Sequence, residues 1–296
     1  EFFASLLSHL SPAATAAWRG VLEQQMKAAD ASPSVSRLLQ RLFVIQGDLD
    51  AYIAIETAKP ENRRDTYQVA LMLHAAGRHE EALVWVRKMT SAMRVLEVNG
   101  MIVGVGADYQ SGERKLLEAD ILDALKQREA AQAIRWSAFL ETFDSEILRR
   151  YVSRLDDFAE FDEVDRAIAA VRASDKIHEA LAFLLDWPNL DQAAAHVLAH
   201  ASQWSGAEYD LLVPAADILS EHYPEAATVL YRSLIRHILD RGISAAYGHA
   251  AEYLRRLAAL SLRLSEDVPF EDHAAFVSGL MNKHPRKYGF WQQISA

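Results

Sequence analysis

Arginine, histidine and tyrosine side chains recur at helical spacing near the C-terminal end of this sequence. Arg232 and Arg236 lie four residues apart and therefore share one face of a helix. His249, Tyr253 and Arg256 share a face of the next predicted helix. Because arginine binds carboxylates and phosphates bidentately, two such faces meeting in a groove suit an acidic peptide, a carboxylate or a phosphate. The competing interpretation is a pair of solvated helix faces whose arginine stems cover apolar surface.

These five residues are the candidate binding residues of the chain. We predict that replacing Arg232 and Arg236 together by alanine abolishes partner binding without unfolding the protein. Unchanged capture of partners by that double variant contradicts the prediction.

Motifs for metal binding and catalysis are weak. His196 and His200 lie four apart on a predicted helix and could face one metal ion, but the neighbouring helices offer no partner motif for a third ligand. The run His79–Leu83 begins like a zincin motif and lacks its second histidine. The chain has no cysteine, which excludes disulfides, thiolate metal sites and cysteine nucleophiles. The sequence therefore predicts no catalytic residue, no metal and no cofactor.

Charge argues against nucleic acid as a general partner. The formal net charge of the 296 residues is −10 at pH 7, whereas phosphate binding needs a positive field. From Val229 onward, nine Lys and Arg residues outnumber six acidic residues, so this part carries +3 and the remainder −13. A nucleic-acid contact through this basic tail is a weaker alternative. No apolar run approaches the roughly 20 residues of a membrane span, and no signal peptide is visible, which predicts a cytoplasmic protein without a membrane partner.

The segment Pro224–Leu264 predicts an αα-hairpin that carries the candidate residues. Apolar residues with a period of 3.6 predict one buried stripe on each helix. Gly242 is expected to end the first helix in a left-handed conformation, and Ser244 to cap the second. The two stripes contain Ala227, Leu230, Tyr231, Leu234, Ile235 and Ile238 on the first helix, and Tyr247, Ala250, Ala251, Leu254, Leu257 and Ser261 on the second.

Helix pairs of the same kind recur along the chain, about sixteen helices in all. Residues 66–89 have the pattern of a tetratricopeptide-like pair, in which small residues let two helices approach closely. Residues 116–143 repeat it with a constant shift of 49, which predicts an internal repeat. The equivalent positions are Ala70 and Ala119, Leu73 and Leu122, Gly77 and Lys126, and Ala82 and Ala131. Helices over Phe270–Lys283 and Arg286–Gln293 are expected to close the chain.

One segment differs from the helices around it. Val95–Val98 and Met101–Val103 are β-rich runs around Asn99-Gly100, the strongest short signal for a hairpin. We expect residues 94–112 to be an inserted loop with a small β-hairpin near 94–105; the alternative is a frayed helix with an irregular loop.

Several strings resemble a bacterial family of unknown function. They are LLEADILDALKQREAAQAIRWSAFLETFDSEILRRYVSRL at Leu116–Leu155, PEAATVLYRSLIRHIL, SAAYGHAAEYLRRL, and the terminal His284 to Trp291. From about Asp48 to the end the chain is also similar to the helical part of bacterial proteins that carry a SWIM zinc finger. That finger needs cysteine and histidine ligands, so its zinc site has no counterpart here. The resemblance implies an all-helical repeat without a catalytic motif, and Glu1 as the start of the C-terminal part of a longer protein.

Taken together, these features predict an all-α fold, an αα-hairpin superhelix or α-solenoid that is tetratricopeptide-like in places. Residues 1–296 are expected to form a single elongated domain. The predicted function is a protein-interaction or scaffold module that binds a peptide or partner protein in a helical groove. The alternative is an enzyme with a site between helices that uses His and Arg side chains of the C-terminal half. A cluster of His, Arg and carboxylate groups in one deep pocket would favour the enzyme, and a long shallow groove would favour the binding module.

Overall fold

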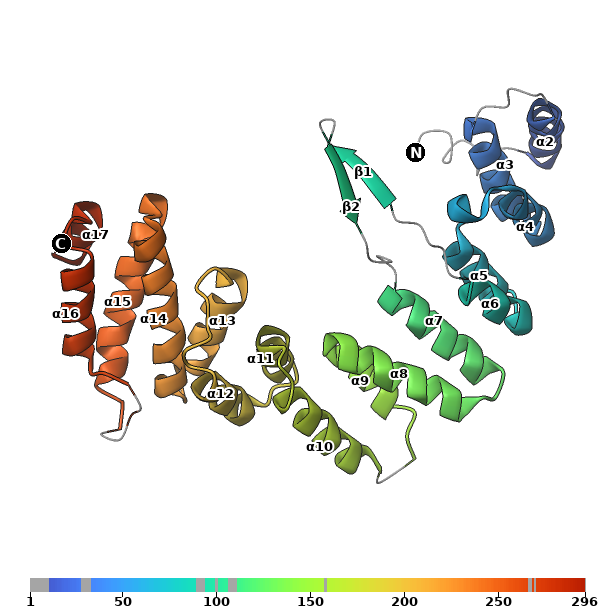
Figure 1. The fold of residues 1–296 in the computed structure, drawn as a ribbon. Coiled ribbons are helices and arrows are strands. Elements are labelled where there is room, and N and C mark those ends of the chain that lie inside the picture. The colour runs from blue at the N-terminus through green and yellow to red at the C-terminus, as the bar shows by residue number, and fades with distance from the viewer. Residues whose placement is uncertain are drawn as a thin grey trace. The chain divides into compact units, whose positions relative to one another are not determined.

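The computed structural model of the protein describes residues 11–27, 33–88, 94–98, 101–105, 111–156, 159–265, 268 and 270–295. Its architecture is all-α, with consecutive helices packed against one another and one short two-stranded sheet (Figure 1). The chain divides into two compact units, Glu1–Ala138 (unit 1) and Phe139–Ala296 (unit 2). The all-α prediction is confirmed. The predictions of a superhelix and of a single elongated domain concern how the two units join, and both remain predictions.

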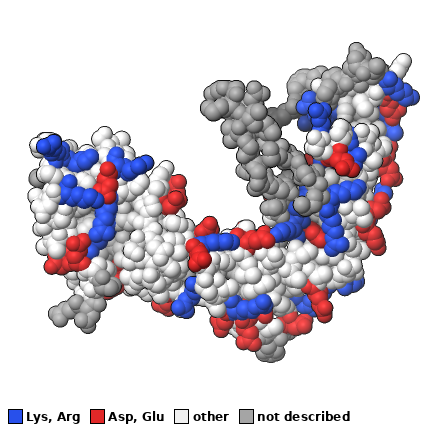
Figure 2. All heavy atoms as spheres, viewed as in Figure 1, with Lys and Arg blue, Asp and Glu red and all other residues white. Residues whose placement is uncertain are grey.

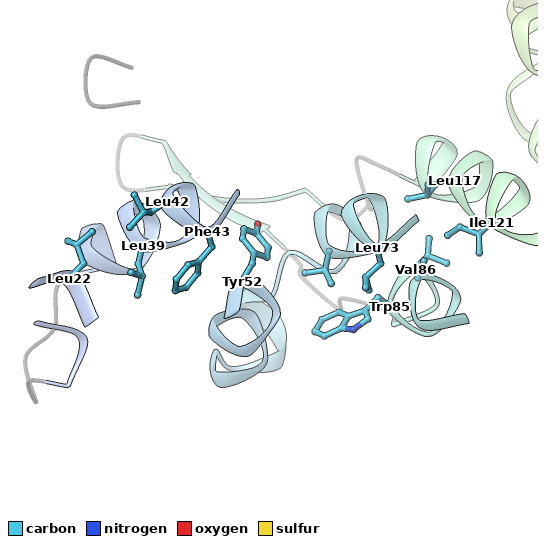
Figure 3. Close-up of a cluster of buried hydrophobic side chains, with 13 residues drawn as sticks. Leu22, Leu39, Leu42, Phe43, Tyr52, Leu73, Trp85, Val86, Leu117 and Ile121 are labelled. Atoms are coloured by element: carbon cyan, nitrogen blue, oxygen red, sulfur yellow. The ribbon is translucent and has the colours of Figure 1, made fainter. Parts of the chain in front are cut away.

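Unit 1 is a series of short helices around a continuous apolar core. Its elements are α2 (Pro12–Met26), α3 (Pro33–Gln46), α4 (Leu49–Ala58), the 3₁₀ turn η1 (Glu61–Arg63), α5 (Thr66–Ala75), α6 (His79–Val86), β1 (Arg94–Val98), β2 (Met101–Val105), α7 (Ser111–Ala124) and the first part of α8 (Arg128–Thr142). Buried side chains follow one another from Leu22 on α2 to Ile121 on α7 (Figure 3). Each helix therefore buries its apolar stripe against its neighbours in sequence.

The two equivalent helix pairs of unit 1 have the same geometry at their turns. All six alanine and leucine positions related by the shift of 49 are fully buried. Gly77 has a φ of +77° and Lys126 a φ of +63°. Arg78 N–H donates to Leu73 C=O over 2.9 Å, and Gln127 N–H donates to Leu122 C=O over the same distance. The left-handed turn is thus kept where glycine has been replaced by lysine.

Strands β1 and β2 pair antiparallel, with Leu96 opposite Val103 and Val98 opposite Met101. Asn99 and Gly100, on which the hairpin prediction rests, lie outside the described residues, as do residues 106–110. The interpretation of 94–112 as an insertion between helical repeats stays a prediction.

Unit 2 is arranged around its longest helix. Besides the end of α8 it contains α9 (Ser145–Val152), α10 (Ala159–Arg172), α11 (Ile177–Asp186), α12 (Leu190–Ala199), α13 (Tyr209–Leu219), α14 (Pro224–Arg241), the 3₁₀ turn η2 (Ser244–Ala246), α15 (Tyr247–Ser261), α16 (His273–Lys283) and α17 (Tyr288–Ser295). Helix α14 packs against α12, α13 and α15. Among the helices described, none combines the length and apolar character needed to cross a membrane.

The hairpin of α14 and α15 confirms most of the pattern expected for it. Gly242 ends α14 with a φ of +66°, and the two predicted stripes are buried except for Ser261. The predicted cap is wrong, because no side-chain hydrogen bond caps α15, which begins at Tyr247. Ser244 instead opens the turn η2, closed by a backbone bond from Ala246 N–H to Ile243 C=O of 2.9 Å. The backbone carbonyl of Ile243 thus acts as an acceptor in this turn, a role that was expected of the Ser244 side chain.

Candidate binding site

A pocket of about 560 Å³ lies beside α14 within unit 2. The loop after α12 forms one wall, α14 the second, and the residues just before α16 the third. Its lining residues are Leu198, Ala201, Ser202, Trp204, Ser205, Gly206, Val229, Arg232, Ser233, Arg236, His237, Asp240, Phe270 and Glu271. The pocket therefore combines apolar surface with basic and acidic side chains.

Arg232 is a buried part of the pocket wall. Its side chain is only 4% exposed, and its guanidinium Nη2 donates to the backbone carbonyls of Glu271 (2.8 Å) and Asp272 (3.3 Å). The guanidinium also lies over the rings of Phe270 and Phe276, at 4.8 and 4.6 Å. Burial lowers the pKa of Arg232, because desolvation opposes its charged form. This arginine thus attaches the start of α16 to α14.

Arg236, one turn further along α14, is exposed. Its Nη2 donates to Oε1 of Glu271 over 3.1 Å, and its guanidinium lies 5.2 Å from the ring centre of Phe276. The pair Arg236–Glu271 is half-exposed, so its ion pair contributes little to folding, on the order of 0–1 kcal/mol. Two arginines on one helix face therefore differ in role, one structural and one accessible.

The loop wall of the pocket depends on a close approach of its backbone to α14. A Cβ atom on Gly206 would lie 2.6 Å from the backbone oxygen of Ser233 and 2.6 Å from Cβ of His237, so only glycine fits. Ser233 donates its hydroxyl to Trp204 C=O over 2.7 Å, and Trp204 donates its indole N–H to Val197 C=O over 2.9 Å. These contacts hold the indole at the pocket and fix the loop against α14.

Asp240 also lines the pocket and already has two basic partners. Its Oδ1 lies 2.7 Å from Nζ of Lys283 and 3.0 Å from Nε2 of His284. The hydrogen bond from Lys283 is the main reason that the pKa of Asp240 lies below its ordinary value. This carboxylate joins the C-terminal ends of α14 and α16, and its ion-pair partners are Lys283 and His284 rather than the pocket arginines.

The other three predicted residues form a separate group and do not line the pocket. Arg256 pairs with Asp217 on α13 and donates to the hydroxyl of Tyr231 over 2.9 Å, and this hydrogen bond raises its pKa. Burial raises the pKa of Tyr231 to about 12. The ring of Tyr253 stacks between the rings of Tyr231, at 5.5 Å, and His249, at 6.4 Å.

The two predicted faces therefore do not line this pocket together. Arg232 and Arg236 line the pocket, whereas the second group fastens α15 to α13 and α14. A binding role for His249, Tyr253 and Arg256 stays a prediction.

The histidine pair on α12 has structural contacts. His196 is buried, and its Nε2 lies 3.0 Å from Ile177 C=O, while its ring contacts His200 at 4.6 Å and Trp204 at 5.8 Å. Across the described part of the chain, no group of three or more His, Asp or Glu side chains could hold a metal ion.

Sequence reasoning missed the pocket walls outside α14, namely Trp204, Gly206, Phe270 and Glu271. Gly206 carried a signal, because a glycine outside a helix pattern can mark a close backbone approach. Nothing in the sequence indicated which helix that loop approaches.

Both signs of charge are interspersed on the viewed face of each unit (Figure 2). On these viewed faces, acidic groups interrupt the positive field that non-specific phosphate binding needs.

Comparison with known proteins gives a family whose function is unknown. No curated protein matches the chain. The similarity to the helical part of SWIM zinc-finger proteins stays a prediction. Residues 9–293 match a family of unknown function (DUF6880), and the chain belongs to this family.

Proposed function

We propose that the chain is a protein-interaction module that holds an extended segment of a partner protein in the pocket beside α14. The observation that carries the proposal is the pocket itself, whose lining combines the apolar side chains of Trp204 and Val229 with Arg236. Tryptophan and arginine are the side chains most enriched among residues that dominate binding energy at protein interfaces. The tetratricopeptide-like character of the helix pairs and a cytoplasmic location belong to the same proposal.

Pre-organisation of the walls supports binding of this kind. Trp204 is fixed by the backbone of α12, and Glu271 is fixed by Arg232. A partner segment that enters such a pocket orders itself without also ordering the protein, which lowers the entropic cost of association. The Ser233 hydroxyl and the Asp240 carboxylate both hold the pocket walls through hydrogen bonds or ion pairs. Because these groups are already engaged, the pocket favours binding over catalysis.

The enzyme alternative has one observation in its favour. His237, Arg236 and the carboxylate of Glu271 line the same pocket, which is the combination of groups that acid–base chemistry on an anion uses. A small molecule that copurifies tightly with the chain, and is lost when the pocket is filled, favours this alternative over partner binding.

Filling the pocket tests the proposal. Ala201 is an exposed residue of the lining, and Ala201→Trp places a large side chain in the space that the partner needs. Ala199→Trp is the matched control, because Ala199 is also exposed and lies two residues away but outside the lining. Partners are captured on the native protein, identified by mass spectrometry, and then measured as purified proteins by calorimetry.

We expect Ala201→Trp to weaken the purified partner's binding by about 2 kcal/mol or more, roughly thirtyfold, and Ala199→Trp to leave it unchanged. Equal binding by both variants contradicts the proposal. Loss of binding in both variants contradicts the placement of the partner in this pocket, and binding that varies only with salt and nucleic acid content indicates the basic-tail alternative instead.

The double alanine variant of Arg232 and Arg236 is not a clean test of binding. Arg232 is buried and holds two backbone carbonyls before α16, so its removal leaves these groups without their donor. Arg236→Ala alone removes the accessible guanidinium and keeps the wall.

A further inference from the structure

We infer that the group recognised in this pocket is a glutamate side chain of the partner segment, which takes the place of Glu271 on Arg236. The inference rests on the proposed function and adds the chemistry of the ligand. It also assigns Glu271 as an internal competitor that occupies the recognition site when no partner is bound.

Arg232 supplies the first argument. Its positive charge is buried in the pocket wall, and among the described residues no carboxylate forms an ion pair with it. Its direct partners are two backbone carbonyls and two aromatic rings, and its Nε has no hydrogen-bond partner in this part of the structure. The carboxylates of Glu271 and Asp272 favour its charge from a distance without forming an ion pair with it. Burying a charge without a direct ion-pair partner is costly, so an anion bound in the pocket gains from this guanidinium even without touching it.

The pair Arg236–Glu271 supplies the second argument. One hydrogen bond of 3.1 Å joins the two side chains, whose exposed fractions are 53% and 42%. Water competes for both groups at this exposure, so exchanging one carboxylate for another costs little. The ring of Phe276 lies under the Arg236 guanidinium, which keeps the arginine in place during the exchange.

The backbone at Glu271 allows the exchange without a larger movement. Arg232 holds the carbonyl of Glu271, whereas the carboxylate of Glu271 contacts Arg236. The side chain can therefore swing away while the main chain stays attached. Asp240 does not replace it, because Lys283 and His284 already bind that carboxylate.

The occupant is a side-chain carboxylate because that is what Arg236 binds now. A glutamate from a partner presents the same group at the same distance from its backbone as Glu271. The neighbouring surfaces of Trp204, Val229 and Phe270 are apolar, so we expect apolar residues beside that glutamate. The ligand class is an extended segment in which glutamate and apolar residues alternate.

The test measures binding of two fluorescein-labelled peptides by anisotropy, one alternating glutamate with leucine and one with glutamine in place of glutamate. Glu271→Gln removes the competitor and is expected to tighten binding of the glutamate peptide roughly two- to fivefold. Glu146→Gln is the matched control, because Glu146 forms a comparably exposed ion pair with Arg150 on α9. Its replacement makes the net charge of the chain more positive by the same amount as Glu271→Gln. It is expected to change nothing, and Arg236→Gln is expected to weaken binding and to cancel the gain from Glu271→Gln.

Three results overturn the inference. The first is equal tightening by Glu271→Gln and Glu146→Gln, which assigns the effect to net charge. The second is equal affinity for the two peptides, or no binding of either to the wild type and Glu271→Gln. The third is much tighter binding of a phosphoserine version of the peptide, which assigns the site to phosphate. If both peptides bind equally and both are lost in Ala201→Trp, partner binding stands and only the carboxylate inference falls.

Discussion

Lys126 holds a backbone conformation that costs free energy for any residue with a Cβ atom. Its φ of +63° matches the φ of +77° at Gly77 in the equivalent turn. The left-handed conformation costs a residue with a Cβ atom roughly 1–2 kcal/mol. Glycine avoids this cost but loses more conformational entropy on folding, which offsets part of the gain. We expect Lys126→Gly to stabilise the protein by about 0.5–1 kcal/mol, raising its melting temperature by a few degrees in calorimetry. Lys126→Ala keeps the Cβ and is the control that should show no gain; a gain equal to that of the glycine variant assigns the effect to the lysine side chain.

Arg232 and Arg236 show what residue spacing could predict about the site. Their separation of four places both on one face of α14, and both line the pocket. The spacing could not predict that one is 4% exposed and the other largely accessible. That difference comes from Phe270 and Asp272, some 40 residues away in sequence, which cover Arg232.

At the scale of elements, His196 makes the packing of α12 on α11 dependent on pH. Its Nε2 contacts Ile177 C=O at 3.0 Å. Burial is the main cause that lowers the pKa of His196 below its usual value near 6.5; the hydrogen bond with Ile177 C=O acts in the opposite direction, and the nearby Arg172 acts with burial. The unfolded chain therefore takes up a proton that the folded chain refuses, so stability falls as the pH drops below about 6.5.

We expect His196→Gln to reduce this loss, because glutamine keeps a side-chain N–H but does not titrate. The measurement is the free energy of unfolding of both proteins in urea at pH 7.5 and pH 5.5. Other histidines with lowered pKa values, such as His74, are common to both proteins and cancel in the comparison. An identical pH dependence of the two proteins is incompatible with this role of His196.

Helix ends were predictable where the chain itself determines them. Gly242 ends α14 with a positive φ, as the sequence indicated. Gly47 likewise follows α3 with a positive φ, and Asp144 caps α9 through Glu146 N–H at 2.7 Å. The helix expected from Phe270 begins at His273 instead, since Asp272 caps it through Ala275 N–H. The backbone of Glu271 is held by Arg232, a tertiary contact that no local pattern records.

At the scale of the whole molecule, the sequence could predict the repeated helix pairs but not the pocket. The repeat pattern is local, because each helix buries its stripe against neighbours in sequence. The pocket is assembled from three segments that are far apart in sequence, around residues 198–206, 229–240 and 270–271. Their meeting depends on how α14 packs against α12 and on the cap of α16, which periodicity does not specify.

A substitution at Gly206 tests whether strain introduced in unit 2 stays within that unit. Its Cβ would meet the backbone of α14, at 2.6 Å from Ser233 O and 2.9 Å from Leu234 Cα, so Gly206→Ala forces the loop away from the helix. Overpacking of this kind costs about 1–3 kcal/mol. Gly279→Ala in α16 is the matched control, because no atom lies within 4 Å of the added Cβ and alanine favours a helix by about 1 kcal/mol.

Because each unit has its own core, we expect hydrogen exchange in Gly206→Ala to accelerate in α12, α13 and α14 of unit 2. Exchange in α5 and α6 of unit 1 is expected to stay at the wild-type rate, since their core is formed within unit 1. Gly279→Ala should leave both regions unchanged or slow exchange near α16. Acceleration of equal size in α5 and in α14 contradicts this expectation, because it shows that the chain opens as one cooperative unit and that the strain at Gly206 is shared by both cores.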